Sequence, residues 1–88
     1  MSGSADFKQA SEDVKNLKQR PDNDDLLALY AHFKQATEGD VVGKRPGMID
    51  FKGRAKFDAW AKLKGKSSAE SEQAYIALVN DLKQKYGF

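Results

Sequence analysis

Apolar residues recur along the chain at intervals of three and four, the spacing of one face of an α-helix. Residues 5–18 show this spacing first, with apolar residues at Phe7, Ala10, Val14 and Leu17. Pro21 prevents the pattern from continuing as helix, because proline has no backbone N–H and its ring clashes with the preceding turn. The pattern therefore predicts a first helix over residues 5–18.

A second apolar stripe follows Pro21 and ends at Gly39. Its members are Leu26, Leu29, Tyr30, Phe33 and Thr37. A third helix is predicted over residues 51–64, with Asp50 as its N-cap. The segment between these two helices, residues 39–50, carries turn signals and no helical pattern. Such a stretch is long for a compact domain, and long loops often carry function or cross the fold.

A fourth helix is predicted to begin at Ser67-Ser68-Ala69-Glu70. This is a capping-box pattern, in which the serine hydroxyl and the glutamate carboxylate accept hydrogen bonds from backbone N–H groups that have no partner inside the helix. One face then carries the apolar residues Ala74, Tyr75, Leu78, Val79, Leu82 and Tyr86. Nothing in the chain has the pattern of a strand. The sequence therefore predicts an all-α four-helix bundle that forms a single domain over residues 1–88.

Composition excludes several classes of protein. The chain has no cysteine and one histidine, which leaves no ligand set for a structural metal, so we expect neither a metal nor a cofactor. No apolar run approaches the roughly 20 residues that span a bilayer, and the first residues do not resemble a secretory signal. We expect a cytoplasmic protein without stable membrane insertion. A net charge of +2 is too small to indicate a nucleic-acid partner.

The charge is unevenly distributed. Residues 50–66 hold six basic and two acidic residues, a net charge of +4, and the rest of the chain has a net charge of −2. Three lysines also interrupt apolar helix faces beside aromatic residues: Lys34, Lys52 and Lys56. A single such lysine is typical of a side chain that lays its stem along the core edge and leaves its ammonium in water. Three on two helices favour a shared anion site, since lysine binds phosphate and aromatic faces stack on bases.

The remaining candidates are weaker. We expect four aromatic residues in the core: Phe7, Phe51, Phe57 and Trp60. His32 falls on the helix face opposite Tyr30 and Lys34, which indicates a surface position. No serine, histidine and carboxylate are arranged for nucleophilic catalysis, and no glycine pattern matches a phosphate loop. These absences favour a binding protein over an enzyme.

Several short motifs now stand out. The sequence YAHFKQATEGD at residues 30–40 resembles the Y-x-x-[YF]-K-Q-A-T-x-G-D motif of the acyl-CoA-binding protein family. RPGM at residues 45–48, DF at 50–51 and KFDAW at 56–60 resemble the family's later elements. The similarity extends from about Phe7 to Phe88 and keeps the motif order. It implies an up-down-down-up bundle with a shallow ligand site across the second and third helices.

The resemblance also implies a ligand and its contacts. The family binds medium- to long-chain acyl-CoA, and we expect this chain to be a monomeric intracellular carrier and pool former. Residues matching Tyr30, Lys34 and Lys56 hold the 3′-phosphate of coenzyme A in the family. The full set of implied acyl-CoA contacts is Lys15, Tyr30, Ala31, His32, Phe33, Lys34, Lys52, Lys56 and Tyr75. The implied acyl-chain groove consists of Leu26, Leu27 and Leu29.

Three positions depart from common family residues. Phe33 replaces a frequent tyrosine and loses its hydroxyl, Phe57 replaces a frequent tryptophan, and Arg20 replaces a common lysine. Two other interpretations stay open on the residues alone. One is a helical module whose groove takes an amphipathic helix of an acidic partner. The other is a thioesterase acting on the same ligand.

Overall fold

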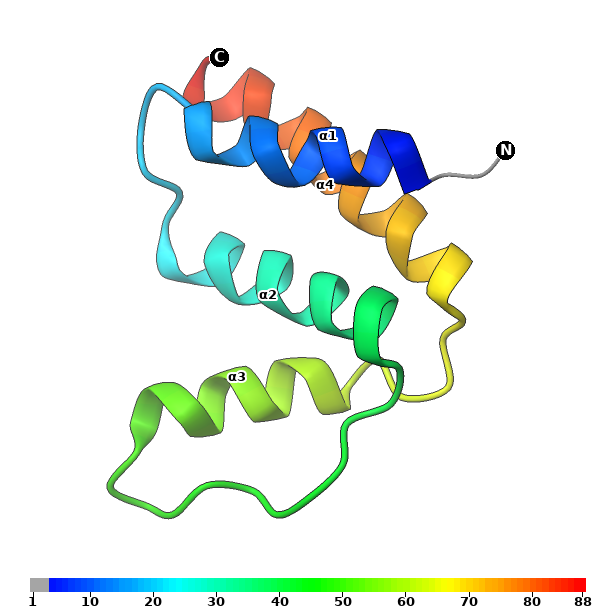
Figure 1. Cartoon of the computed structure of the whole chain (residues 1–88). Helices are drawn as coiled ribbons and strands as arrows, with labels where there is room; N and C mark the ends of the chain where they lie inside the picture. The colour runs from blue at the N-terminus through cyan, green and yellow to red at the C-terminus, as the bar shows by residue number, and fades with distance from the viewer. Residues whose placement is uncertain (1–3) are drawn as a thin grey trace.

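The computed structural model describes residues 4–88, which form four α-helices and one 3-10 turn and contain no strand. The elements are α1 (Ser4–Asp13), η1 (Val14–Asn16), α2 (Asn23–Glu38), α3 (Phe51–Ala61) and α4 (Ser68–Tyr86). Helices α1 and α4 run in one direction and α2 and α3 in the other, because the loop at residues 39–50 carries the chain back beneath α3 (Figure 1). The predicted up-down-down-up bundle is confirmed.

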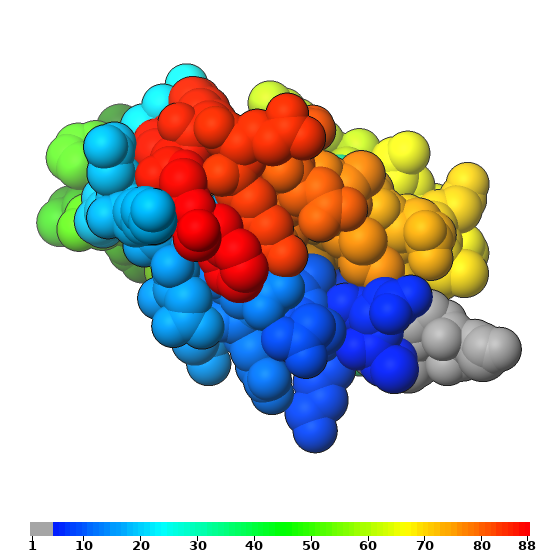
Figure 2. Space-filling model, turned by 90° about the horizontal axis from the view of Figure 1, so that it is seen from above, coloured from blue at the N-terminus to red at the C-terminus, as the bar shows by residue number. Residues whose placement is uncertain are grey.

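The first helix is shorter than its apolar pattern suggests. α-Helical bonding ends at Asp13, the chain tightens into η1, and Leu17 is extended with ψ 141°. Just beyond, the backbone N–H of Lys18 donates to the carbonyl of Gly87 at 2.9 Å. The segment after α1 thus lies against the end of α4, as Figure 2 shows from above. This tertiary contact explains why the helix does not continue to Lys18.

The third helix also ends early, at Ala61 instead of residue 64. The next turn uses bonds between residues three apart, from Leu63 N to Trp60 O at 2.9 Å and from Lys64 N to Ala61 O at 3.2 Å. Such bonds tighten a final helical turn. Gly65 then reverses the chain with φ +94°, a backbone angle that glycine adopts without steric cost.

The predicted caps of α3 and α4 are confirmed, whereas Ser4, predicted to be the N-cap of the first helix, is the first residue of α1. Ser67 Oγ accepts from Glu70 N at 3.1 Å, while Glu70 Oε1 accepts from Ser67 N at 3.0 Å, which completes the capping box of α4. Asp50 accepts from Gly53 N at 2.9 Å at the start of α3. These side chains satisfy N–H groups that have no partner inside the helix.

Helix α2 lies between α3 and α4, and α1 packs on α4 (Figure 1). The buried core cluster consists of Phe7, Ala10, Leu29, Ala36, Tyr75, Val79 and Leu82. The predicted stripe of α2 is therefore partly wrong, since Thr37 is exposed while Gln35 and Ala31 are buried. The reason is that α2 has two neighbours and must bury residues on two sides. No helix in the described part of the chain has the length and apolar content that crossing a membrane requires.

Candidate ligand-binding site between α2 and α3

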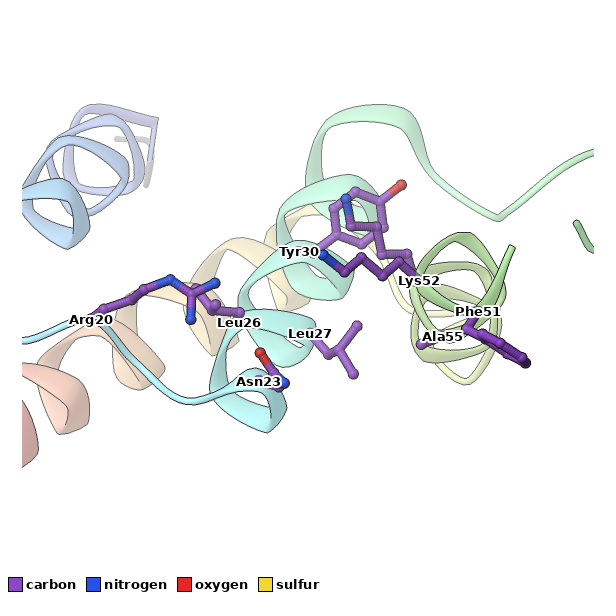
Figure 3. A pocket seen from close by; sticks show the side chains of 9 residues that line it. Arg20, Asn23, Leu26, Leu27, Tyr30, Phe51, Lys52 and Ala55 are labelled. Carbon is purple, nitrogen blue, oxygen red and sulfur yellow. The ribbon is translucent and has the colours of Figure 1, made fainter. Parts of the chain in front are cut away.

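A cavity of about 540 Å³ opens between the first turns of α2 and α3. Its lining combines apolar and basic side chains: Arg20, Asn23, Leu26, Leu27, Tyr30, Phe51, Lys52, Ala55 and Lys56. Leu27 projects from α2 into the space between the helices, and Lys52 extends from α3 toward Tyr30 (Figure 3). Because α2 and α3 run in the same direction, their first turns lie at one end of the bundle. The parallel arrangement thus brings apolar and cationic side chains together in one site.

An aromatic pair connects this cavity to a further lysine. The Nζ of Lys56 lies 5.4 Å from the ring centroid of Tyr30. Tyr30 meets the ring of Trp60 edge-on, with centroids 6.5 Å apart and planes at 85°. The Nζ of Lys34 lies 5.2 Å from the ring centroid of Trp60. Two cations therefore flank one pair of aromatic rings, within the distance of a cation–π contact.

The three lysines differ in their neighbours. Lys34 forms an ion pair with Glu38, one turn further along α2. The hydrogen bond to this carboxylate raises the pKa of Lys34 above its usual value. No carboxylate among residues 4–88 pairs with Lys52 or Lys56. An anion bound here would contact Lys52 and Lys56 directly, whereas Lys34 would first have to release the Glu38 carboxylate.

Trp60 is held in place by a buried amide. Its Nε1 donates to the carbonyl of Gly39 at 2.8 Å and to Oε1 of Gln35 at 3.1 Å. Gln35 is fully buried, and its Nε2 donates to Asp40 Oδ1 at 2.8 Å and to the Lys66 carbonyl at 3.0 Å. The backbone N–H of Gly65 and the Gln35 amide lower the pKa of the Asp40 carboxyl. Gln35, Gly39 and Asp40, which follow Lys34 in the sequence, thus hold the Trp60 ring in position next to the Lys34 ammonium.

The structure brings five predicted site residues to the cavity wall: Leu26, Leu27, Tyr30, Lys52 and Lys56. Lys34 is joined to them through Trp60. Leu29 is not at the wall, because it is 7% exposed and packs in the core. Lys15 is exposed in η1, outside the cavity lining.

Two predicted aromatic residues form a different cluster. The rings of Phe33 and Tyr75 lie 5.8 Å apart, and Phe7 packs against both at 5.4 Å and 5.1 Å. This cluster joins α1, α2 and α4 and is not part of the cavity lining. Burial raises the pKa of the Tyr75 hydroxyl. Phe33 keeps more than a third of its surface exposed, so its ring covers the cluster from outside.

His32 and Ala31 face a second hollow between α2 and α3, of about 480 Å³, whose lining also includes Asp58 and Leu63. The expectation that His32 is a surface residue is wrong, because it is half-buried and its Nδ1 has no hydrogen-bond partner among residues 4–88. Burial, with a smaller effect of Lys66, lowers the pKa of the imidazole. The cause is that α3 covers part of this face of α2.

Four cavity residues were missed by sequence reasoning: Arg20, Asn23, Phe51 and Ala55. Phe51 was expected in the core, yet it is 79% exposed, because it is the first residue of α3. Phe57, expected in the core too, is half-buried. A usable signal existed, since Phe51 and Ala55 share the four-residue spacing of Lys52 and Lys56. Within residues 4–88, acidic and histidine side chains nowhere gather in threes that could bind a metal ion.

The sequence model of the family described as acyl-CoA-binding protein matches residues 4–79. This chain belongs to the acyl-CoA-binding protein family. It is 51% identical over 81 residues to acyl-CoA-binding protein homolog 1 of Caenorhabditis elegans, which covers 92% of this chain and 94% of that protein. Identity to the acyl-CoA-binding protein homolog of Drosophila melanogaster is also 51%, over 83 residues, which are 94% of this chain and 96% of the relative.

The fold agrees with solved members of the acyl-CoA-binding protein family. The crystal structure of acyl-CoA-binding protein 2 of Oryza sativa superposes with a TM-score of 0.89 and 38% identity, over 94% of this chain and 90% of that one. The family membership that the motifs indicated is therefore confirmed by sequence and by structure.

Proposed function

We propose that this chain binds medium- to long-chain acyl-CoA esters in the cavity between α2 and α3, as a cytoplasmic carrier and pool former. The observation that carries the proposal is the combination in one cavity of an apolar wall, formed by Leu26, Leu27 and Ala55, with the cations Lys52 and Lys56, which pair with no carboxylate in the described part of the chain. A ligand with an anionic head and an apolar tail complements both parts. The names of the relatives support this assignment.

The acyl chain supplies most of the gross binding energy. Covering ten methylene groups contributes roughly 8 kcal/mol at about 0.8 kcal/mol each, from which the ordering of chain and protein subtracts. A volume of about 540 Å³ lies within the usual range of small-molecule sites. The tail lies against Leu26 and Leu27 in this proposal. Leu29 would support that wall from the core without contacting the ligand.

The head group supplies specificity. Tyr30, Lys34 and Lys56 hold the 3′-phosphate, the tyrosine through its hydroxyl and the lysines through their charge. Lys34 would exchange the Glu38 carboxylate for the phosphate, which costs little because exposed ion pairs within a helix are weak. Five further assignments lie outside the first cavity and stay predictions from the family: Lys15, Ala31, His32, Phe33 and Tyr75.

Titration calorimetry with palmitoyl-CoA, coenzyme A and palmitate tests the head-plus-tail arrangement. Palmitoyl-CoA should bind far more tightly than either component, because only it fills both parts of the site. Equal affinity for palmitoyl-CoA and palmitate would reject the proposal. The same samples test the absence of catalysis, since release of free thiol on incubation would indicate hydrolysis of the thioester.

A second titration tests the phosphate contacts with 3′-dephospho-palmitoyl-CoA. The unmodified protein should lose affinity strongly, because a charge-assisted hydrogen bond contributes about 1.5–3 kcal/mol. The Lys34→Ala, Lys56→Ala double variant should bind the two ligands almost equally. A Lys8→Ala, Lys64→Ala variant removes the same charge from exposed positions and should discriminate like the unmodified protein. Full discrimination by the first variant would show that other residues bind the phosphate.

A further inference from the structure

The cavity between α2 and α3 has a second basic end, which the proposed function does not use. Arg20, in the segment between η1 and α2, lines this cavity together with Asn23, the first residue of α2. In Figure 3, Leu26 and Leu27 lie between Arg20 and helix α3, which carries Lys52. A ligand that lies along the two leucines would therefore have basic side chains near both of its ends.

The acidic residues that follow Arg20 in the sequence are directed away from this cavity. Asp22 caps α2 and accepts from Asp25 N at 3.0 Å, while Asp25 Oδ2 accepts from Tyr86 Oη at 2.6 Å. Asp24 lines the second hollow instead of the first. Every charged side chain that lines the first cavity from residues 4–88 is basic, and no carboxylate in that range forms an ion pair with Arg20. The guanidinium is thus available to an anion that enters the cavity.

An arginine at this position favours a carboxylate as the anion. Its planar guanidinium presents parallel N–H groups that match the two oxygens of a carboxylate, whereas a lysine offers only a point charge. Asn23 lines the same cavity and carries an amide that donates further N–H groups. The terminal methyl group of an ordinary acyl chain would leave all these donors without an acceptor from the ligand.

The proposed function sets the direction of the ligand, and the present inference rests on it. In that proposal Tyr30, Lys34 and Lys56 hold the 3′-phosphate, and the two leucines contact the tail. Arg20 lies beyond the leucines, so it faces the end of the tail that is far from the thioester. We propose that Arg20, with Asn23, binds a carboxylate at this distal end, and that the chain therefore accepts the coenzyme A mono-thioesters of long-chain dicarboxylic acids.

The expected gain is tolerance of the second carboxylate more than a large increase in affinity. A site for an acyl tail ordinarily rejects a charged end, because a charge taken out of water without a partner is costly. Arg20 is exposed, so a carboxylate beside it would keep part of its hydration. Solvent weakens such a pair, while hydrogen bonds between two charged groups are stronger than those between neutral groups. The contact should therefore offset the cost of the charge at this end of the cavity.

Titration calorimetry of the full chain with three ligands tests this inference. They are palmitoyl-CoA, the coenzyme A mono-thioester of hexadecanedioic acid, and the same thioester with its free carboxyl group converted into a methyl ester. The unmodified protein should bind the free acid at least as tightly as the methyl ester, and this preference should fall as salt is raised, because salt screens the pair. Arg20→Gln should weaken the free acid about tenfold and leave palmitoyl-CoA unchanged. Lys18→Gln removes an exposed charge from the same segment, outside the cavity lining, and should bind all three ligands like the unmodified protein.

Three results would overturn the distal carboxylate site. The unmodified protein could bind the free acid much more weakly than the methyl ester, a comparison that needs no variant and so does not depend on how Arg20→Gln folds. Arg20→Gln could bind the free acid as tightly as the unmodified protein. It could also weaken the free acid and palmitoyl-CoA equally, which would assign Arg20 to the head group. A failure of the proposed function is distinguishable from all three, because the unmodified protein would then bind palmitoyl-CoA no more tightly than palmitate.

Discussion

The buried amide of Gln35 offers the sharpest test of how the fold positions the site. Gln35 makes hydrogen bonds with Trp60, Asp40 and the Lys66 carbonyl, and so joins α2 to α3 and to the turn before α4. Replacing it by leucine keeps a similar volume but removes all three bonds. Each intramolecular hydrogen bond contributes about 1 kcal/mol net, so Gln35→Leu should lower the free energy of unfolding by about 3 kcal/mol.

Such a loss is a large part of the stability of a small domain, which is typically about 5–15 kcal/mol. It should lower the melting temperature by about 12–24 °C, at about 4–8 °C per kcal/mol for a domain of this size. Urea denaturation followed by fluorescence measures it directly, because Trp60 is the chain's one tryptophan. Gln84→Leu, an exposed change on α4, is the matched control and should be nearly neutral. If Gln35→Leu lowers the free energy of unfolding by less than about 0.5 kcal/mol, the reasoning is refuted, because ordinary surface substitutions have effects of that size.

Four further predictions follow from the site and the caps. Leu27→Asp should weaken palmitoyl-CoA far more than coenzyme A in calorimetry while the helical circular dichroism is preserved, and equal losses would point instead to the fold or the head-group site. Glu38→Gln should tighten binding of the 3′-phosphate ligand slightly, because Lys34 no longer has a competing carboxylate, and weaker binding would contradict the exchange. Because burial lowers the pKa of His32, the unfolded chain binds the proton more readily, so the free energy of unfolding should fall as pH drops below about 6.5. His32→Gln should remove that part of the pH dependence, and an unchanged pH profile in urea denaturation would exclude it. Ser67→Ala should cost about 1 kcal/mol by removing the cap of α4, with Ser68→Ala as the neighbouring control.

Much of the fold was predictable because local signals agreed with tertiary packing. The apolar faces around Phe7 and Val79 both enter the core, and the caps at Asp50 and Ser67 form as expected. Helix ends were less predictable, since they depend on contacts between distant parts of the chain. The bond from Lys18 to Gly87 has no counterpart in local spacing.

The site was predictable only in part. Lys52 and Lys56 could be found because charges interrupt apolar faces, and Tyr30 through the family motif, and the structure places the three together. The burial of Gln35 could not be read from the sequence, because a polar residue shows no apolar period and its partners lie in other segments. The prediction for Phe51 was wrong in the opposite direction, because a core position was expected and the side chain is exposed. An aromatic residue is usually buried, and nothing local shows that no helix covers the start of α3.

The order in which the helices pack constrains when this chain can fold during synthesis. Helix α1 packs on α4, and α2 packs on α4 and α3, whereas α1 and α2 meet through side chains such as Phe7 and Phe33. Tyr75, Val79 and Leu82, at the centre of the core, all belong to α4. While the ribosome still holds α4, the emerged helices lack their main partner, and isolated helices of these lengths are marginal in water. Most cooperative folding should therefore wait until the last helix leaves the ribosomal tunnel.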